Sequence, residues 1–274
     1  MFLTKTNILD ILKQNTFAPN KKLGQNFLCE KGIIEKIIGH IDSNENVLEI
    51  GPGLGCVTFP LAHKVKNVCA VELDKGYFKY LCQEKEKQNL KNINFIHSDI
   101  LEVDLREILK EETVVFGNLP YYITGPLLMK LIEERRFIKK AIIMVQKEVA
   151  DRLKAKKGNK IYGKTTVLFD MFASVKHLCN VPATCFFPEP NVDSTVLEIV
   201  MQQNSKICLE NEDLFFKMVK EAFGQRRKQL VNSLDGMFDK KKLIEILENL
   251  GIGAHVRAEE LSAEDFARIA NALR

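Results

Sequence analysis

Residues 46–55 read NVLEIGPGLG, a short apolar run that ends in three closely spaced glycines. The apolar run predicts a buried β-strand, and the glycines predict a tight turn into a helix, where a ligand can approach the main chain closely. A dinucleotide site would show the spacing G-x-G-x-x-G, but Cys56 stands at the third small position here. The stretch therefore favours a nucleoside cofactor other than a dinucleotide.

The same apolar pattern recurs along the chain with helical segments between the runs. Such runs suit the central strands of a parallel sheet that is covered by helices on both faces and joined by right-handed crossovers. Two more strand-like pieces lie between residues 174 and 200, separated by a proline-rich loop, and could pair antiparallel at one edge. We expect an α/β fold with a doubly wound sheet and an antiparallel edge strand. The recurring runs are NVCAVELD (67–74), INFIHSD (93–99), TVVFGN (113–118) and AIIMV (141–145).

The strand pattern stops after Met201, and the acidic stretch ENED (210–213) follows. Beyond it, apolar residues repeat at helical spacing within 215–223, 243–250 and 266–273. We therefore expect two domains. An N-terminal arm and the α/β domain would occupy residues 1–203, and a small all-α domain would occupy residues 204–274.

Composition sets limits on the class of protein. Of the 274 residues, 46% are hydrophobic and 28% are charged, which is typical of an ordinary globular chain. No stretch approaches the roughly 20 apolar residues that span a bilayer, so we expect a cytoplasmic protein with no membrane partner. The seven cysteines are scattered and form no C-x-x-C pair, so neither disulfides nor a metal site is expected.

Acidic residues follow two further predicted strands. Glu72 lies 21 residues after Gly51, where a carboxylate can accept hydrogen bonds from ribose hydroxyls, and Asp99 lies where a carboxylate can accept the amino group of adenine. Because the carboxyl ends of parallel strands meet at one edge, these residues should converge with the glycine loop. The alternative is that the glycines only form a turn and the acids only cap helices; the ordered set of three motifs disfavours it.

The stretch GNLPYY (117–122) follows the fourth predicted strand. Adenine's exocyclic amine is a poor nucleophile, so two oxygen acceptors aimed at its hydrogens would favour a reactive tetrahedral geometry. Asn118 offers a side-chain carbonyl, and Leu119 offers a main-chain carbonyl whose direction Pro120 restricts. Tyr121 can stack on a base. The alternative is an ordinary turn after a strand.

Basic residues gather in three places, although the net charge is only +4. Residues 152–164 read RLKAKKGNKIYGK and contain no acid, which suits a phosphate backbone. Lys240–Lys242 has acidic neighbours, and we interpret it as a solvated face. The expected RNA-binding residues are Lys21, Lys22, Arg152, Lys154, Lys156, Lys157, Lys160, Arg226, Arg227 and Lys228.

The glycine loop with Glu72 and Asp99 resembles the class I S-adenosylmethionine-dependent methyltransferases. Nearly the whole chain resembles the ribosomal RNA adenine dimethyltransferase family, whose bacterial members modify two adjacent adenines near the 3′ end of 16S RNA. Asn191 departs from the lysine usual in that family, and Tyr122 departs from its common asparagine. The matching motifs are KLGQNFL (22–28), EIGPGLG (49–55), VELD (71–74), HSDIL (97–101), GNLPYY (117–122), QKEVA (146–150), IYG (161–163) and FFPEPNVDS (186–194).

The resemblance implies roles for particular residues. The glycine loop would approach the methionine part of S-adenosylmethionine, Glu72 would hold the ribose, and Asp99 would meet the adenine. Phe186 would cover the target base opposite Tyr121, although core packing is its alternative. The implied catalytic residues are Asn118, Leu119, Pro120, Tyr121 and Phe186. The implied cofactor contacts are Gln25, Asn26, Leu28, Gly51, Gly53, Glu72, Leu73, Asp99, Ile100 and Asn118.

The implied activity is dimethylation of two adjacent adenines of 16S RNA in an immature 30S subunit, by a monomer that leaves S-adenosylhomocysteine as product. The macrolide-resistance methyltransferases, which modify one adenine of 23S RNA, are the nearest alternative. The stretch KIYG (160–163), V-D-S (192–194) and AFGQRRK (222–228) favour the small-subunit enzyme. A non-catalytic ribosome-assembly factor and a nicotinamide-dependent oxidoreductase are further alternatives.

Overall fold

The computed structural model describes residues 2–20, 24–109, 113–225 and 227–273. These residues form two compact units, one of Met1–Ala150 with Lys176–Met201 and one of Asp151–Val175 with Gln202–Arg274. The sequence placed a domain boundary at residue 203, whereas here Asp151–Val175 packs with the C-terminal residues. Among the described helices, none combines the length and apolar composition needed to cross a bilayer.

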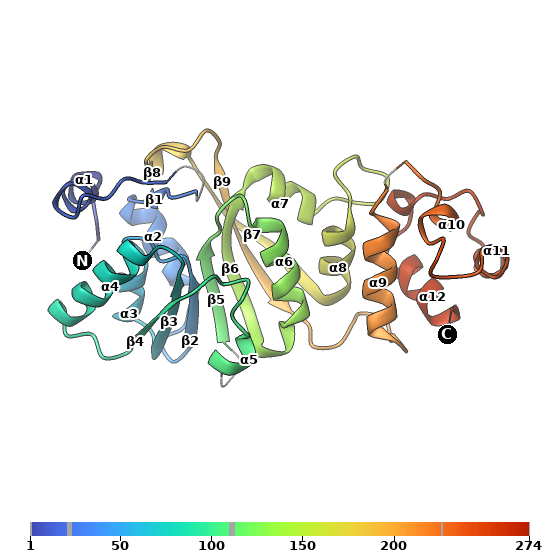
Figure 1. Ribbon diagram of the computed structural model, residues 1–274, viewed down its shortest axis with the longest axis horizontal. Coiled ribbons are helices and arrows are strands. Elements are labelled where there is room, and N and C mark those ends of the chain that lie inside the picture. Colours follow the sequence, from blue (N-terminus) through green and yellow to red (C-terminus); the bar gives the residue numbers. More distant parts are fainter. Residues whose placement is uncertain (1, 21–23, 110–112, 226, 274) are drawn as a thin grey trace. The chain divides into compact units, whose positions relative to one another are not determined.

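A seven-stranded sheet forms the centre of the first unit (Figure 1). Its order is β4-β3-β2-β5-β6-β9-β7, with parallel pairing from β4 through β6 and antiparallel pairing between β6 and β9. The expected α/β fold with an antiparallel edge strand is therefore confirmed. The strands are β2 (Asn46–Ile50), β3 (Asn67–Glu72), β4 (Ile93–His97), β5 (Thr113–Asn118), β6 (Ile138–Gln146), β7 (Ala173–Val181) and β9 (Ser194–Met201).

The strand order creates a crevice at one edge of the sheet. From β2, the chain first adds β3 and β4 on one side and then returns to add β5 and β6 on the other. Adjacent crossovers that leave a strand in opposite directions open a ligand site at the carboxyl ends of the strands. The helices of this unit are α1 (Lys5–Gln14), α2 (Lys31–Gly39), α3 (Thr58–Ala62), α4 (Lys75–Lys87), α5 (Leu105–Ile108), α6 (Thr124–Glu133) and α7 (Lys147–Leu153), which runs into the second unit, with a 3-10 turn η2 (Arg135–Phe137) before β6.

The N-terminal arm is attached by a small sheet of its own. Strand β1 (Phe27–Leu28) pairs antiparallel with β8 (Phe186–Phe187), which follows the 3-10 turn η3 (Ala183–Cys185). The main-chain N–H of Cys29 extends this pairing by donating to the carbonyl of Cys185 at 2.9 Å. Two segments far apart in the sequence thereby hold the arm in place beside the crevice.

Aromatic packing organises the second unit. The ring of Phe172 stacks on Phe216 at 5.3 Å, and Tyr162 meets Phe223 edge-on at 6.1 Å. These contacts tie residues 151–175 to the C-terminal helices, which is why this segment groups with them. The three apolar stripes expected beyond residue 204 all lie on helices. The elements are α8 (Lys164–Phe172), α9 (Glu212–Ala222), α10 (Leu230–Ser233), α11 (Lys240–Asn249), η4 (Ala258–Glu260) and α12 (Ala263–Ala272).

Candidate active site

A pocket lies at the carboxyl ends of β2 to β5, entirely within the first unit. Its wall comes from the arm, the glycine loop, the ends of β3 and β4, and the GNLPYY loop. Every residue that the sequence predicted to contact the cofactor lines this pocket, so the structure brings the whole set together. These residues are Gln25, Asn26, Leu28, Gly51, Gly53, Glu72, Leu73, Asp99, Ile100 and Asn118.

The glycine loop has a backbone that side chains would strain. Gly53 has a φ of 58°, and a Cβ there would lie 3.0 Å from the ring of Phe27 in the arm. Gly55 has a φ of 78°, and its Cβ would lie 2.3 Å from the ring of Phe59. The left-handed φ and these close approaches together require glycine. The loop thus lets the arm and α3 pack closely around the pocket floor.

Glu72 ends β3 and is buried, with both carboxylate oxygens engaged. Oε2 accepts the main-chain N–H of Gly53 at 2.9 Å, and Oε1 accepts that of Asp74 at 2.8 Å. Burial raises the pKa of Glu72, and these two hydrogen bonds act in the opposite direction. Each oxygen keeps a further lone pair for a ligand hydroxyl. Glu72 therefore holds the glycine loop in place as well as offering acceptors to the pocket.

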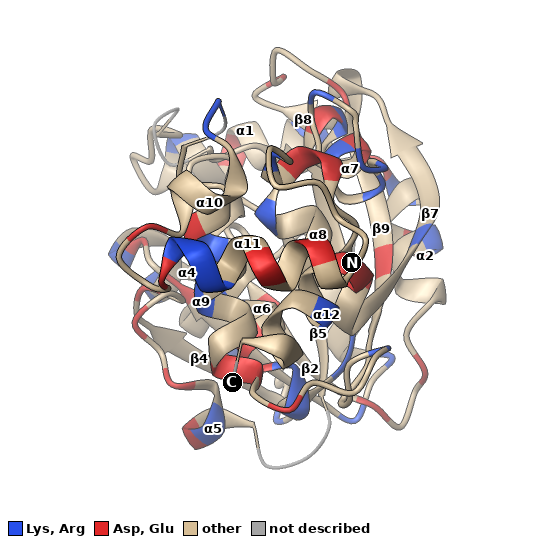
Figure 2. Ribbon diagram, turned by 90° about the vertical axis from the view of Figure 1, so that its right-hand side faces the viewer, with Lys and Arg blue, Asp and Glu red and all other residues tan. Residues whose placement is uncertain are grey.

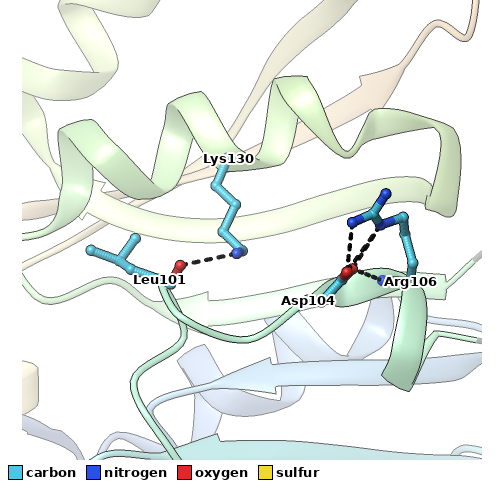
Figure 3. A network of polar contacts seen from close by, with 4 residues as sticks. All are labelled: Leu101, Asp104, Arg106 and Lys130. Carbon is cyan, nitrogen blue, oxygen red and sulfur yellow. Dashed lines mark hydrogen bonds and ion pairs between the residues drawn. The ribbon is translucent and has the colours of Figure 1, made fainter.

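The turn after β4 places Asp99 and Ile100 in the pocket wall. Asp99 accepts the main-chain N–H of Leu101 at 2.9 Å through Oδ1. Lys130 of α6 donates to the carbonyl of Leu101 at 3.1 Å, which ties this turn to the helix that follows GNLPYY (Figure 3). The nearby pair of Asp104 and Arg106, also drawn in Figure 3, caps α5 at the surface.

The arm closes one side of the pocket through polar contacts. The side-chain amide of Gln25 accepts a hydrogen bond from the hydroxyl of Tyr77 at 3.0 Å and donates one to Asp74 at 3.2 Å. It thereby bridges a residue of α4, Tyr77, and the N-cap of that helix, Asp74. Gly24 has a φ of 61°, and a Cβ placed on it would lie 3.5 Å from the Cα of Pro120. The arm therefore touches both α4 and the GNLPYY loop.

The amide of Asn118 is oriented by the arm. Its Nδ2 donates to the main-chain carbonyl of Asn26 at 3.1 Å. Because the nitrogen is engaged there, Oδ1 is the end of the amide that can accept a hydrogen bond from a ligand. The sequence predicted the acceptor, but it did not predict that Asn26 would orient it.

The main chain after Asn118 is held on both sides. The N–H of Leu119 donates to the carbonyl of Met144 in β6 at 3.0 Å, and the Leu119 side chain is buried. The carbonyl of Pro120 accepts the hydroxyl of Thr124 at 3.0 Å, which joins the loop to the start of α6. These bonds fix the peptide groups around the Leu119 carbonyl, the second predicted acceptor.

The aromatic residues are placed differently from one another. Tyr122 is 48% exposed and lines the pocket. Partial burial is the main cause that raises the pKa of its hydroxyl, and the charges of Asp99 and Glu72 raise it further. Tyr121 is half-buried and lies outside the lining. Phe186 is buried in the core, as its packing alternative implies. Stacking of a target base on Tyr121 and Phe186 stays a prediction.

The sequence also missed two acids of the lining, Glu49 and Asp74. An acid inside an otherwise apolar strand is unusual, because a buried carboxyl group needs a partner. This pattern could have identified Glu49 as a candidate site residue from the sequence alone. With Glu72 and Asp99, the pocket has four carboxyl groups, and no lysine, arginine or histidine occurs among the described residues that line it. Such a pocket suits a ligand with positive charge.

The described basic residues of the predicted RNA surface lie in the second unit, while Lys21, Lys22 and Arg226 lie outside the described residues. Lys157 pairs with Asp265 at 3.1 Å, which anchors its loop to α12. Helix α11 carries acidic as well as basic residues (Figure 2), and Lys240 pairs with Asp235 at 2.9 Å. The described members are Arg152, Lys154, Lys156, Lys157, Lys160, Arg227 and Lys228.

The sheet order and the pocket above the glycine loop define a class I methyltransferase fold. Residues 16–274 match the family model for ribosomal RNA adenine dimethylase, and the chain belongs to this family. As a member it is an S-adenosylmethionine-dependent methyltransferase that acts on ribosomal RNA.

Known proteins support this placement. The chain is 39% identical to ribosomal RNA small subunit methyltransferase A of Lachnoclostridium phytofermentans, over 96% of this chain and 94% of that one. It is 38% identical to the protein of that name from Clostridioides difficile, over 96% and 93%. A dimethyladenosine transferase of Plasmodium falciparum superposes with a TM-score of 0.74 at 27% identity, covering 88% of this chain and 94% of that one. The 23S rRNA methyltransferase ErmE shares the fold, with a TM-score of 0.66 at 22% identity, covering 90% and 99%.

The residues present fit the cofactor of this family. S-Adenosylmethionine carries a positive sulfonium, and the pocket offers four carboxyl groups. One of them, Glu49, has a buried oxygen for which the described part of the chain supplies no hydrogen-bond partner. The backbone at Gly51 is open, because apart from its chain neighbours no described residue comes within 4 Å of the position of a Cβ there, and this leaves room for a ligand. The lining therefore matches a cationic nucleoside.

Proposed function

We propose that this protein dimethylates the N6 amines of two adjacent adenines near the 3′ end of 16S RNA, within an immature small ribosomal subunit. The relatives named ribosomal RNA small subunit methyltransferase A, at 37–39% identity over nearly the whole chain, support the choice of subunit. The observation that carries the chemistry is the amide of Asn118, which Asn26 orients at the edge of a carboxylate-rich pocket.

The pocket would bind the cofactor through residues of three strand ends. When bound, S-adenosylmethionine supplies a methyl group activated by a positive sulfur. Glu72 would accept the ribose hydroxyls while it continues to hold Gly53, and Asp99 would accept the adenine amine. The arm would shield one side of the bound cofactor from water, since Gln25 and Asn26 line the pocket and are held by hydrogen bonds to Asp74 and Asn118.

The target amine would be held by two oxygens. Oδ1 of Asn118 and the carbonyl of Leu119 accept its two hydrogens, which draws the nitrogen lone pair out of conjugation with the ring. The bonds from Leu119 to Met144 and from Thr124 to Pro120 keep this geometry before the base arrives. Positioning supplies most of the rate advantage, and the amine proton can leave to water.

RNA docking would use the basic residues of the second unit. The exposed lysines of residues 152–164 offer positive charge to phosphates, as do the consecutive residues Arg227 and Lys228. Tyr121 would stack on the target base and Phe186 would cover its other face. We further propose that the enzyme acts as a monomer in the cytoplasm, where its ribosomal RNA substrate is assembled.

The test supplies labelled S-adenosylmethionine with undermethylated 30S subunits or with 50S subunits. We expect label in the 30S RNA and essentially none in the 50S RNA. The matched control is Asn118→Ala, which removes one acceptor and should keep RNA binding while transfer is lost. Label confined to 50S RNA would assign the activity to the large subunit, and full activity of the variant would remove Asn118 from the mechanism.

A further inference from the structure

Glu49 is a buried acid with one carboxyl oxygen left unsatisfied by the described residues. It lies in β2, in register with Ala70 of β3 and Phe116 of β5, where most neighbours are apolar. Its side chain is 3% exposed, it lines the pocket, and its Oε2 has no hydrogen-bond partner among the described residues. A buried ionised carboxylate without partners is costly, so an acid in this position needs either a proton or a cation.

Without a bound ligand, the groups around Glu49 favour the protonated form of its carboxyl. Burial raises the pKa of Glu49, the hydroxyl of Thr58 lowers it and the charge of Glu72 raises it, and the resulting pKa is about 8. Asp74, Tyr77 and Asp99 also line the pocket, and Cys56 beside it has a pKa raised by burial. No cationic side chain occurs in the described lining, so only a ligand can compensate a negative charge on Glu49.

The two forms of the cofactor differ in charge. S-Adenosylmethionine has a sulfonium, an ammonium and a carboxylate, hence a net charge of +1. S-Adenosylhomocysteine lacks the sulfonium charge and is net neutral. A positive charge that enters a water-poor pocket stabilises a nearby carboxylate strongly, because the effective dielectric constant there is low.

We propose that Glu49 selects the charged cofactor by losing its proton when S-adenosylmethionine binds and regaining one when S-adenosylhomocysteine remains. On binding, the O–H bond of Glu49 breaks and the proton leaves to the solvent. After transfer, the amine proton of the adenine leaves to water, and Glu49 takes a proton back from solvent. Over one turnover Glu49 is unchanged, so the net reaction releases only the amine proton.

This linkage favours exchange of product for substrate. The ionised form binds the sulfonium tightly, whereas the protonated form has no charge to offer. The inference rests on the assignment of this pocket to S-adenosylmethionine, and it is independent of which RNA is methylated. Glu49 thereby becomes a specificity-determining residue for the cofactor.

The test is calorimetric titration of the full chain, without RNA, in buffers of different ionisation enthalpy. Near pH 7 we expect S-adenosylmethionine to release close to one proton and S-adenosylhomocysteine clearly fewer. The affinity for S-adenosylmethionine should rise by up to about tenfold per pH unit below pH 8 and level off above it. Equal proton release by the two ligands would overturn the proposal.

Two variants locate the proton. Glu49→Gln should remove the difference between the ligands, and any release that persists reports the ligand's own amino group. Thr58→Val keeps the shape of the side chain and removes the hydroxyl, so the pH dependence should move to higher pH. Persistence of the full difference in Glu49→Gln would overturn the proposal. If that variant does not fold, the comparison of the two ligands on the natural protein still decides.

A failure of the proposed function would show itself differently. In that case S-adenosylmethionine would bind with its proton release, and 30S RNA would stay unmethylated. If instead 30S RNA is methylated and the two ligands release equal numbers of protons, only the role of Glu49 is wrong.

Discussion

Strands β2 and β3 lie side by side, and each brings a buried glutamate to the same pocket, yet the two carboxyl groups differ in their partners. Glu72 accepts two main-chain N–H groups, whereas Oε2 of Glu49 has no hydrogen-bond partner among the described residues. A satisfied buried acid contributes to the fold; an unsatisfied one costs stability and is explained by a ligand. The same substitution should therefore have opposite effects at the two positions.

The largest expected effect is stabilisation by Glu49→Gln. Burial raises the pKa of Glu49 to about 8, above the ordinary 4.5 of a glutamate, so between these pH values the folded protein keeps a proton that the unfolded chain releases. The stability of the natural protein therefore falls as pH rises through this window, by up to about 1.4 kcal/mol per pH unit. Glutamine does not ionise, so the gain from the variant should be small near pH 4 and largest at pH 8.

Urea unfolding of the natural protein and of Glu49→Gln at pH 5, 6, 7 and 8 measures this gain. A stability difference that does not change with pH would show that Glu49 is ionised in the folded protein throughout this range.

Glu72→Gln should act in the opposite direction. Glutamine has one acceptor oxygen, so its amide nitrogen would face the N–H of either Gly53 or Asp74 and leave a buried donor unpaired. We expect a loss of about 1–3 kcal/mol in the free energy of unfolding and weaker binding of S-adenosylmethionine. Urea unfolding at pH 7 and calorimetry measure the two effects, and a variant as stable as the natural protein would contradict the structural role of Glu72.

Gly53→Ala tests the other end of the Glu72 hydrogen bond. The φ of 58° and the approach of 3.0 Å to Phe27 both disfavour a Cβ, so we expect a loss of about 1–2 kcal/mol and reduced cofactor affinity. Gly125→Ala is a control of the same chemistry, because no described residue outside its own turn of helix lies within 4 Å of its Cβ position. Similar thermal unfolding of the two variants would argue against a strained loop.

The smallest effect on stability is expected for Thr58→Val. The buried hydroxyl of Thr58 interacts with the carboxyl of Glu49 and lowers its pKa, but it makes no hydrogen bond of good geometry among the described residues, so its removal should change the free energy of unfolding by less than about 1 kcal/mol. The fold should stay intact while the environment of Glu49 becomes less polar. A large loss of stability, measured by urea unfolding, would indicate that Thr58 has a bonding role.

Much of the site could be predicted because it follows from local sequence. Glycines after a strand and acids at the next strand ends must meet at one edge of a parallel sheet, and Gly51, Glu72 and Asp99 do line one pocket. The protonation of Glu49 could not be predicted in this way. It depends on burial against strands β3 and β5, which are distant in sequence.

Other features depend on contacts between distant segments. The bond from Asn118 to the carbonyl of Asn26 spans 92 positions of the chain, and no local pattern signals it. Residues 151–175 were expected with the α/β domain, but Tyr162 packs on Phe223 and Lys157 pairs with Asp265, so they join the helical unit. Of the consecutive residues Tyr121 and Tyr122, only Tyr122 lines the pocket, a choice set by the tertiary turn before α6.

The most direct test of the proposed activity identifies the methylated nucleosides themselves. Undermethylated 30S subunits are incubated with the protein and S-adenosylmethionine, and the 16S RNA is digested and sequenced by mass spectrometry. We expect N6,N6-dimethyladenosine at two adjacent positions near the 3′ end, and unmodified adenine at both with Asn118→Ala. Unmethylated adenines there with the natural protein, despite bound S-adenosylmethionine, would contradict the proposed function.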